Sequence, residues 1–192
     1  MISSACSDLA VKRGHELFLL NRSVSSNYPA PIDSTILQAD IHADSAHLTT
    51  LLAGHRFDAV VDFLAYTPQD IARDISLFRN KTDQFVFISS ASAYQKPLQN
   101  YLITEQTPLE NPFWEYSRNK IACEDLLMKT YRDDGFPVTV VRPSHTYGPS
   151  QIPFCVSSWL HPWTVIDRMK RGEKVIVPGD GTSLPSHSPW RY

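Results

Sequence analysis

The amino-acid sequence predicts an α/β fold, in which a doubly wound parallel sheet carries helices on both faces. Its short apolar segments are apolar at nearly every position, as expected of strands that are buried on both sides. These segments alternate with stretches whose apolar residues recur at helical spacing. A chain of 192 residues is long enough to bury such a core in one domain of ordinary size.

The first elements follow from one stop signal and two apolar runs. A helix is expected at 4–13 because Gly14 is a typical terminator, and the apolar run 16–20 after it is expected to be a strand. A polar stretch that contains prolines leads to a second strand at 35–40. The segment 45–52 then fits a short helix.

The remaining elements alternate regularly. Strands are expected at 59–64, 85–88 and 138–141, where the chain is rich in Val, Ile and Phe. Between the first two lies a helix at 68–78, with a proline at its first position and apolar residues at helical spacing. A longer helix at 114–132 ends before a glycine and precedes the last strand.

Composition excludes several classes of protein. With 42% hydrophobic residues, 20% charged residues and a net charge of -2, the chain is typical of a soluble globular protein, and nucleic acid is not an expected partner. No apolar run approaches the roughly 20 residues needed to cross a bilayer. Three widely spaced cysteines and seven histidines without metal-ligand spacing favour a cytoplasmic chain that has no disulfide framework and no metal.

Tyr116 and Lys120 are the strongest candidates for chemistry. Four residues apart on the expected helix, they share one face, and a cation beside a phenol favours the phenolate. Ser90 follows the strand at 85–88, and a serine aimed at the same point would complete a relay for a proton on a carbinol. The spacing alone is equally compatible with a solvated helix face.

Five segments occur in an order that resembles the NAD-dependent epimerase/dehydratase branch of the extended short-chain dehydrogenase/reductase superfamily. The resemblance runs from about residue 2 to residue 182, and it implies a Rossmann-like fold. Each segment alone is a weak signal, whereas the ordered set is specific. The five segments are 89–94, 104–109, 116–120, 141–149 and 179–181.

The resemblance implies an NAD(P)-dependent oxidoreductase of the epimerase/dehydratase type, acting on a nucleotide-sugar or similar carbinol. Tyr116 would be the acid/base at the substrate oxygen, and Lys120 would contact the nicotinamide ribose as well as the tyrosine. Ser90 would share the substrate's proton. The family's common step is hydride transfer between a sugar-like carbinol and the cofactor.

The same resemblance implies a set of cofactor contacts. Arg22, at the end of the strand at 16–20, favours NADP because it could grip a 2′-phosphate, while the branch name favours NAD, so NAD and NADP both stay open. Asp40 and Ile41 would bracket the adenine. The other implied contacts are Phe63, Leu64 and Ala65 at the end of the strand at 59–64, Lys120, Pro143 and His145.

Relative to the family, the chain looks truncated at both ends. No G-x-x-G-x-x-G turn occurs in it, and we expect a cofactor-binding domain at 1–150, a partial substrate-binding region at 151–183 and a disordered tail at 184–192. A fold that lacks its first strand would leave an unpaired seam in the sheet. We therefore expect the chain as given to bind dinucleotide weakly or to be an inactive fragment.

Two further expectations follow from the superfamily. Its dimers pack around the helix that carries Tyr116, so a homodimer is one expectation. Some members, including the chloroplast stem-loop RNA-binding proteins, are not enzymes. They share with this chain an Asn-Arg pair at the end of one strand, here Asn21 and Arg22. The RNA-binding alternative would need clustered Lys and Arg, which the sequence does not show.

Overall fold

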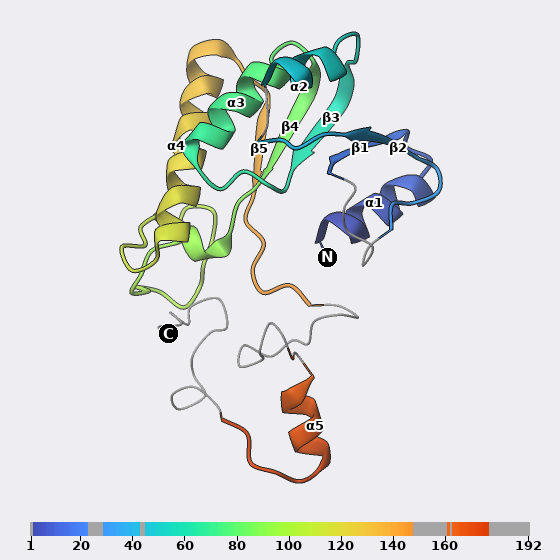
Figure 1. Ribbon diagram of the computed structural model, residues 1–192. Helices are drawn as coiled ribbons and strands as arrows, with labels where there is room; N and C mark the ends of the chain where they lie inside the picture. Colours follow the sequence, from blue (N-terminus) through green and yellow to red (C-terminus); the bar gives the residue numbers. More distant parts are fainter. Residues whose placement is uncertain (1, 23–28, 43–44, 148–160, 162, 177–192) are drawn as a thin grey trace. The chain divides into compact units, whose positions relative to one another are not determined.

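The computed structural model describes residues 2–22, 29–42, 45–147, 161 and 163–176 (Figure 1). Within them the chain alternates helices and strands as an α/β protein. The helices are α1 (Ile2–Lys12), α2 (Ser45–Leu51), α3 (Pro68–Phe78), α4 (Glu115–Asp134) and α5 (Thr164–Lys170), with a single 3-10 turn, η1, at Ala91–Ala93. The strands are β1 (Leu17–Asn21), β2 (Ser34–Gln38), β3 (Phe57–Asp62), β4 (Thr82–Ile88) and β5 (Val138–Val141).

The described strands form two sheets. β1 pairs with β2, and β3 pairs with β4, both in parallel, while β5 completes a second sheet in the order β3-β4-β5. The predicted parallel, Rossmann-like α/β fold is therefore confirmed. Among the described residues β1 and β3 each have a strand neighbour on one side only, and the rings of Phe18 and Phe57 meet edge to face with centroids 5.6 Å apart.

The chain divides into two compact units. Unit 1 comprises 1–88 and 122–140, and unit 2 comprises 89–121 and 141–192. Unit 1 holds the hydrophobic core, which the strands and helices of that unit line with apolar side chains. The core residues are Leu37, Ala39, Leu48, Leu52, Ala65, Ile71, Ile75, Leu77, Phe78, Phe85, Phe87, Cys123, Leu127 and Phe136.

Local signals fix the helix ends as the sequence predicts. Gly14 ends α1 with a φ of 78°, a conformation that favours glycine. Thr67 caps α3: its hydroxyl accepts from the Asp70 backbone N–H at 3.3 Å, and the Asp70 carboxylate accepts from the Thr67 backbone N–H at 3.0 Å. Pro68 follows at the first helical position, where no N–H is needed.

Several expected bounds differ from the structure by a few residues. The strand expected at 59–64 ends at Asp62, so Phe63, Leu64 and Ala65 lie just beyond β3 and not within it. The reason is chemical, since the Asp62 carboxylate accepts from the backbone N–H groups of Leu64 and Ala65 at 2.7 and 3.1 Å and turns the chain out of the sheet.

One helix was not predicted. α5 in unit 2 is only seven residues long, and its preceding residue, Trp163, provides no side-chain cap, so it carries no sequence signal for a helix start. The expected boundary near residue 150, the segment 179–181 and the tail at 184–192 lie outside the described residues.

Candidate active site

Ser90 lies in unit 2, at the turn that follows β4. Its backbone is extended, and its hydroxyl caps η1 by accepting from the Ser92 backbone N–H at 3.2 Å. The flanking N–H groups fix the turn: Ser89 donates to the Val141 carbonyl at 2.8 Å, and Ala91 donates to the Pro143 carbonyl at 3.0 Å. The position of Ser90 is therefore set by backbone pairing on both sides of it.

Three serine hydroxyls form a chain in unit 2. The Ser117 Oγ donates to the Ser92 Oγ at 2.8 Å, and the Ser92 and Ser90 Oγ atoms are 2.9 Å apart. Ser92 and Ser117 are buried. The Asn111 amide, also buried, donates to the Ser92 carbonyl at 2.8 Å and holds the same turn. This network joins the Ser90 turn to helix α4.

Tyr116 and Lys120 lie on adjacent turns of α4, as predicted. The Lys120 Nζ is 5.8 Å from the centre of the Tyr116 ring, and the Lys120 side chain is only 2% exposed. An ammonium within about 6 Å of a ring centre is attracted to the electron-rich face of the ring, and burial strengthens that attraction. Trp114 packs against Tyr116 with ring centroids 4.8 Å apart.

The burial pattern of α4 explains why the sequence places these residues there. Buried side chains recur every three or four residues along the helix, which is the spacing of one helical face. Polar residues occupy part of this stripe, so it does not look like an ordinary apolar face. The stripe consists of Ser117, Lys120, Cys123, Glu124, Leu127 and Thr130.

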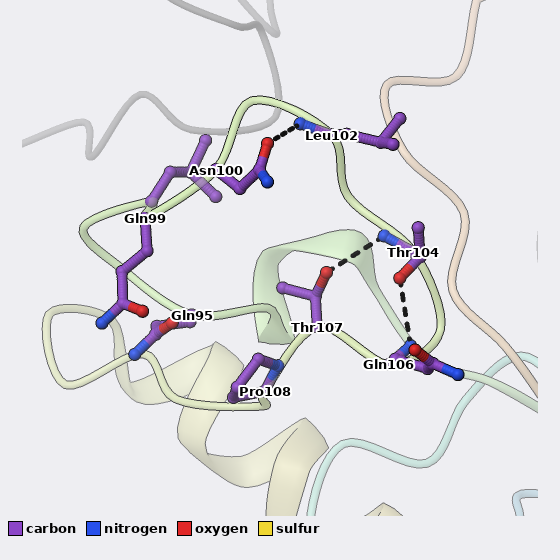
Figure 2. A pocket seen from close by; sticks show the side chains of 9 residues that line it. Gln95, Gln99, Asn100, Leu102, Thr104, Gln106, Thr107 and Pro108 are labelled. Atoms are coloured by element: carbon purple, nitrogen blue, oxygen red, sulfur yellow. Dashed lines mark hydrogen bonds between the residues drawn. The ribbon is translucent and has the colours of Figure 1, made fainter.

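An open hollow of about 280 Å³ lies in unit 2, in the loop at 95–108 (Figure 2). Its loop is held by its own side chains: the Thr107 hydroxyl accepts from the Thr104 backbone N–H at 3.0 Å, and the Asn100 side chain accepts from the Leu102 backbone N–H at 2.9 Å. None of the predicted site residues lines it. Its lining residues are Gln95, Leu98, Gln99, Asn100, Leu102, Thr104, Gln106, Thr107 and Pro108.

The two predicted cofactor residues after β5 also lie in unit 2. Pro143 uses its carbonyl to hold the turn after Ser90, as described above. The His145 Nε2 is buried and has no hydrogen-bond partner in the described part of the chain. A buried ring nitrogen without a partner is costly, and a polar group of a bound molecule could satisfy it.

The other predicted cofactor residues lie in unit 1. Arg22 and Asp40 are brought together as an exposed ion pair, with nitrogen and oxygen 3.8 Å apart. Ile41 packs against the core. Leu64 is 46% exposed, while Ala65 is fully buried in the core.

A cluster of charges fixes the chain between β3 and α3. Burial opposes ionisation of Asp70, but the backbone N–H groups of Tyr66 and Thr67 and the Arg73 guanidinium hold the pKa of Asp70 below its usual value. Burial, together with the neighbouring Asp62 carboxylate, raises the pKa of Asp74 to about 8. Arg73 bridges the cluster, donating to Asp70 at 3.1 Å and to Asp74 at 2.9 Å.

Sequence reasoning missed Ser92, Ser117 and Asn111 as parts of the site. The signal for Ser92 and Ser117 was present, since Ser92 is two residues after Ser90 and Ser117 directly follows Tyr116. A serine on the buried face of a helix needs a partner, and that requirement points to a second hydroxyl. Asn111 gave no such signal, because its contact depends on a loop fold that sequence spacing does not encode.

The parallel strands and alternating helices place the chain among Rossmann-like α/β proteins. More specifically, the chain belongs to the NAD dependent epimerase/dehydratase family, which matches residues 1–185. The resemblance noted in the sequence is thereby confirmed. No curated protein sequence matches the chain at a significant level.

Solved structures share the fold at low identity. A UDP-glucose 4-epimerase from Thermotoga maritima, solved with UDP-glucose, is 21% identical, with a TM-score of 0.71 over 94% of this chain and 63% of its own. A UDP-glucuronic acid 4-epimerase from Bacillus cereus, solved with UDP-glucuronic acid and NAD, is 18% identical, with a TM-score of 0.68 over 93% of this chain and 63% of its own. A Thermus thermophilus UDP-glucose 4-epimerase solved with NAD is 18% identical, with a TM-score of 0.68 over 80% of this chain and 55% of its own.

This chain therefore spans less than two thirds of the length of each of these structures. Among the helices of the described residues, none combines the length and the apolar character that a membrane crossing requires.

Proposed function

We propose that this chain is the cofactor-binding and acid/base part of an NAD-dependent oxidoreductase of the epimerase/dehydratase type, acting on a nucleotide-sugar or a similar carbinol. The observation that carries the proposal is the buried Lys120 ammonium 5.8 Å from the Tyr116 ring, in a chain that belongs to this family. The solved relatives with UDP-sugars support the substrate class.

The residues present fit a dinucleotide. The Nε2 of His145, which has no hydrogen-bond partner in the described part of the chain, supplies a polar group for it. His145, Pro143 and Lys120 would hold the nicotinamide end, and Asp40 and Ile41 the adenine. We favour NAD over NADP because the Asp40 carboxylate neutralises Arg22 and would repel a 2′-phosphate.

In the proposed reaction, bound NAD supplies the acceptor for a hydride. Tyr116 takes a proton from the substrate hydroxyl when the carbinol is oxidised and returns it in the reverse direction. The Lys120 ammonium stabilises the phenolate that this transfer needs, because an adjacent opposite charge favours the charged form. Ser90 holds the substrate oxygen by a hydrogen bond.

Replacing Tyr116 with phenylalanine tests the acid/base role. We expect the rate of UDP-sugar oxidation at millimolar NAD to fall by about 100-fold or more, since a positioned proton-transfer group contributes at least that much. Tyr131→Phe is the matched control, because Tyr131 lies on the same helix and is exposed. Undiminished activity in Tyr116→Phe, with both variants folded, would reject the proposed site.

Cofactor affinity is a separate test. We expect this chain to bind NAD with a dissociation constant well above the micromolar range, because β1 and β3 have no strand between them among the described residues and the chain has no G-x-x-G-x-x-G turn. A titration of tryptophan fluorescence with NAD measures this. Micromolar binding would contradict the expected weakness, and no binding at any attainable concentration would contradict the function.

A further inference from the structure

The hydroxyl of Ser117 has no role in the proposed reaction. It is nevertheless fully buried on α4 and donates a hydrogen bond to the Ser92 Oγ. Burying a hydroxyl that has no hydrogen-bond partner costs free energy, so the hydrogen bonds that join Ser117, Ser92 and Ser90 stabilise this part of the fold. The direction of the hydrogen bonds among these three serines decides whether Ser90 can donate a hydrogen bond to another molecule or accept one from it.

A hydroxyl has one proton to donate and two lone pairs to accept. The Ser92 Oγ accepts from Ser117 at 2.8 Å and lies 2.9 Å from the Ser90 Oγ, a contact in which either hydroxyl could be the donor. If Ser90 were the donor, the proton of the buried Ser92 would have no acceptor among the hydrogen bonds of the described residues, so we take Ser92 as the donor. Ser90 also accepts from the Ser92 backbone N–H at 3.2 Å. Both lone pairs of Ser90 are then engaged, and the Ser90 proton is the one group left to interact with another molecule.

We propose that Ser117 and Ser92 are positioning residues that make Ser90 an obligate hydrogen-bond donor. Ser90 then donates to the substrate oxygen, which accepts as a hydroxyl, an alkoxide or a carbonyl, and Ser90 does not take the substrate's proton. The substrate hydroxyl gives its proton to Tyr116 alone. This inference rests on the proposed function for its substrate, and on the serine geometry for everything else.

Two observations indicate that the three serine hydroxyls are held in fixed positions. The Asn111 amide donates to the Ser92 carbonyl at 2.8 Å from a buried position, so the Ser92 backbone cannot turn away. Ser117 is the residue next to Tyr116, so the rigid helix that positions the phenol also positions the first hydroxyl of the chain. Cooperative hydrogen bonds of this kind strengthen the last donor in the series.

The hydroxyl protons themselves give a test that needs no activity. In a protein labelled with ¹³C at serine Cβ and dissolved in equal parts of H₂O and D₂O, a slowly exchanging hydroxyl gives two Cβ signals, and a rapidly exchanging one gives a single signal. We expect two signals for Ser92 and Ser117, and one signal for Ser92 after Ser90→Ala, which removes the acceptor of the Ser92 proton. Thr130→Ala, which removes a hydroxyl that serves only its own helix through the Leu126 carbonyl, should leave Ser92 unchanged.

A single averaged Ser92 signal in the unaltered chain, or a doubled one that persists in Ser90→Ala, would overturn the inference. Ser92→Ala approaches the same question from the other side. It should leave Ser117 without an acceptor and collapse the Ser117 pair of signals into one.

Kinetics then separate the inference from the proposed function. We expect Ser117→Ala and Ser92→Ala to lower kcat by roughly tenfold, the value of one well-placed hydrogen bond, with little change in KM. The double variant Ser90→Ala/Ser117→Ala should be no slower than Ser90→Ala. If Ser90→Ala has no effect, the proposed function fails. If Ser90→Ala lowers kcat while Ser117→Ala does not, the positioning role of Ser117 is rejected.

Discussion

Replacing Asp74 with asparagine is expected to stabilise the protein at pH 8 and to flatten its stability between pH 5.5 and pH 8. The Asp74 side chain is buried, and burial together with the Asp62 carboxylate raises its pKa to about 8 from a usual value of 3.8. The folded state therefore binds a proton that the unfolded state releases. Stability is highest below the unfolded pKa and declines as the pH rises toward the folded pKa.

The other charges around Asp74 do not reverse this sign. Asp70 has a lowered pKa, so its contribution is lost only as the pH falls below its ordinary value, outside the tested window. The Arg73 guanidinium contacts both Asp70 and Asp74, and His42 is an exposed neighbour of the same cluster. Between the two pKa values each pH unit corresponds to about 1.4 kcal/mol, so the loss between pH 5.5 and pH 8 is on the order of 3 kcal/mol.

Asparagine matches aspartate in shape and keeps an oxygen for the Arg73 Nε, but it carries no charge. Urea unfolding at pH 5.5 and pH 8 measures the difference between the variant and the unaltered chain. Asp58→Asn is the matched control, because Asp58 is an exposed aspartate on β3. An Asp74→Asn protein that is less stable than the unaltered chain at pH 8 would show that the charged form is the stabilising one.

Truncating Phe85 to alanine is expected to cost about 3–5 kcal/mol of unfolding free energy, since a fully buried aromatic leaves both lost transfer energy and a cavity. Phe85 lies at the centre of the unit 1 core, with no exposed surface, and its ring centroid is 6.2 Å from that of Phe78 and 5.3 Å from that of Phe136. These neighbours come from α3 and from the segment before β5, so the loss removes contacts between elements.

Such a loss is a large part of the 5–15 kcal/mol that holds an ordinary domain together, so Phe85→Ala is expected to unfold at markedly lower urea concentration. Phe113→Ala, which truncates an exposed phenylalanine, should change stability by less than about 0.5 kcal/mol. A loss of less than 1 kcal/mol for Phe85→Ala would mean that unit 1 repacks around the cavity.

Much of the fold could be predicted because the signals are local. The apolar runs at β4 and β5, the proline at the start of α3 and the glycine after α1 each determine a neighbouring element through backbone preference and burial. The strand predicted at 59–64 lies two residues earlier, at 57–62. It ends early because the Asp62 side chain competes with the sheet for backbone N–H groups. That competition depends on a carboxylate orientation which periodicity does not report.

The candidate site shows the same division. Helical spacing placed Tyr116 and Lys120 on one face, and Ser90 followed from the end of a strand, but spacing alone did not distinguish a reactive pair from a solvated helix face. The ordered set of five segments favoured the reactive pair. Burial of Lys120 and the hydroxyl chain through Ser92 and Ser117 arise from contacts between segments 25 residues apart. Arg22 left the choice between NAD and NADP open in the sequence, because its pairing with Asp40 is equally non-local.

By itself, the sequence determined the class of the fold, the order of its elements and the residue types available for proton transfer, since these depend on propensity, periodicity and spacing along one chain. Only the tertiary structure decided which of those groups lose water and which touch. Burial raises the pKa of Asp74 and removes Lys120 from solvent, and packing brings three serine hydroxyls into hydrogen-bond contact. The reason is that desolvation and hydrogen-bond direction are properties of packed surroundings, and residues distant in sequence supply those surroundings.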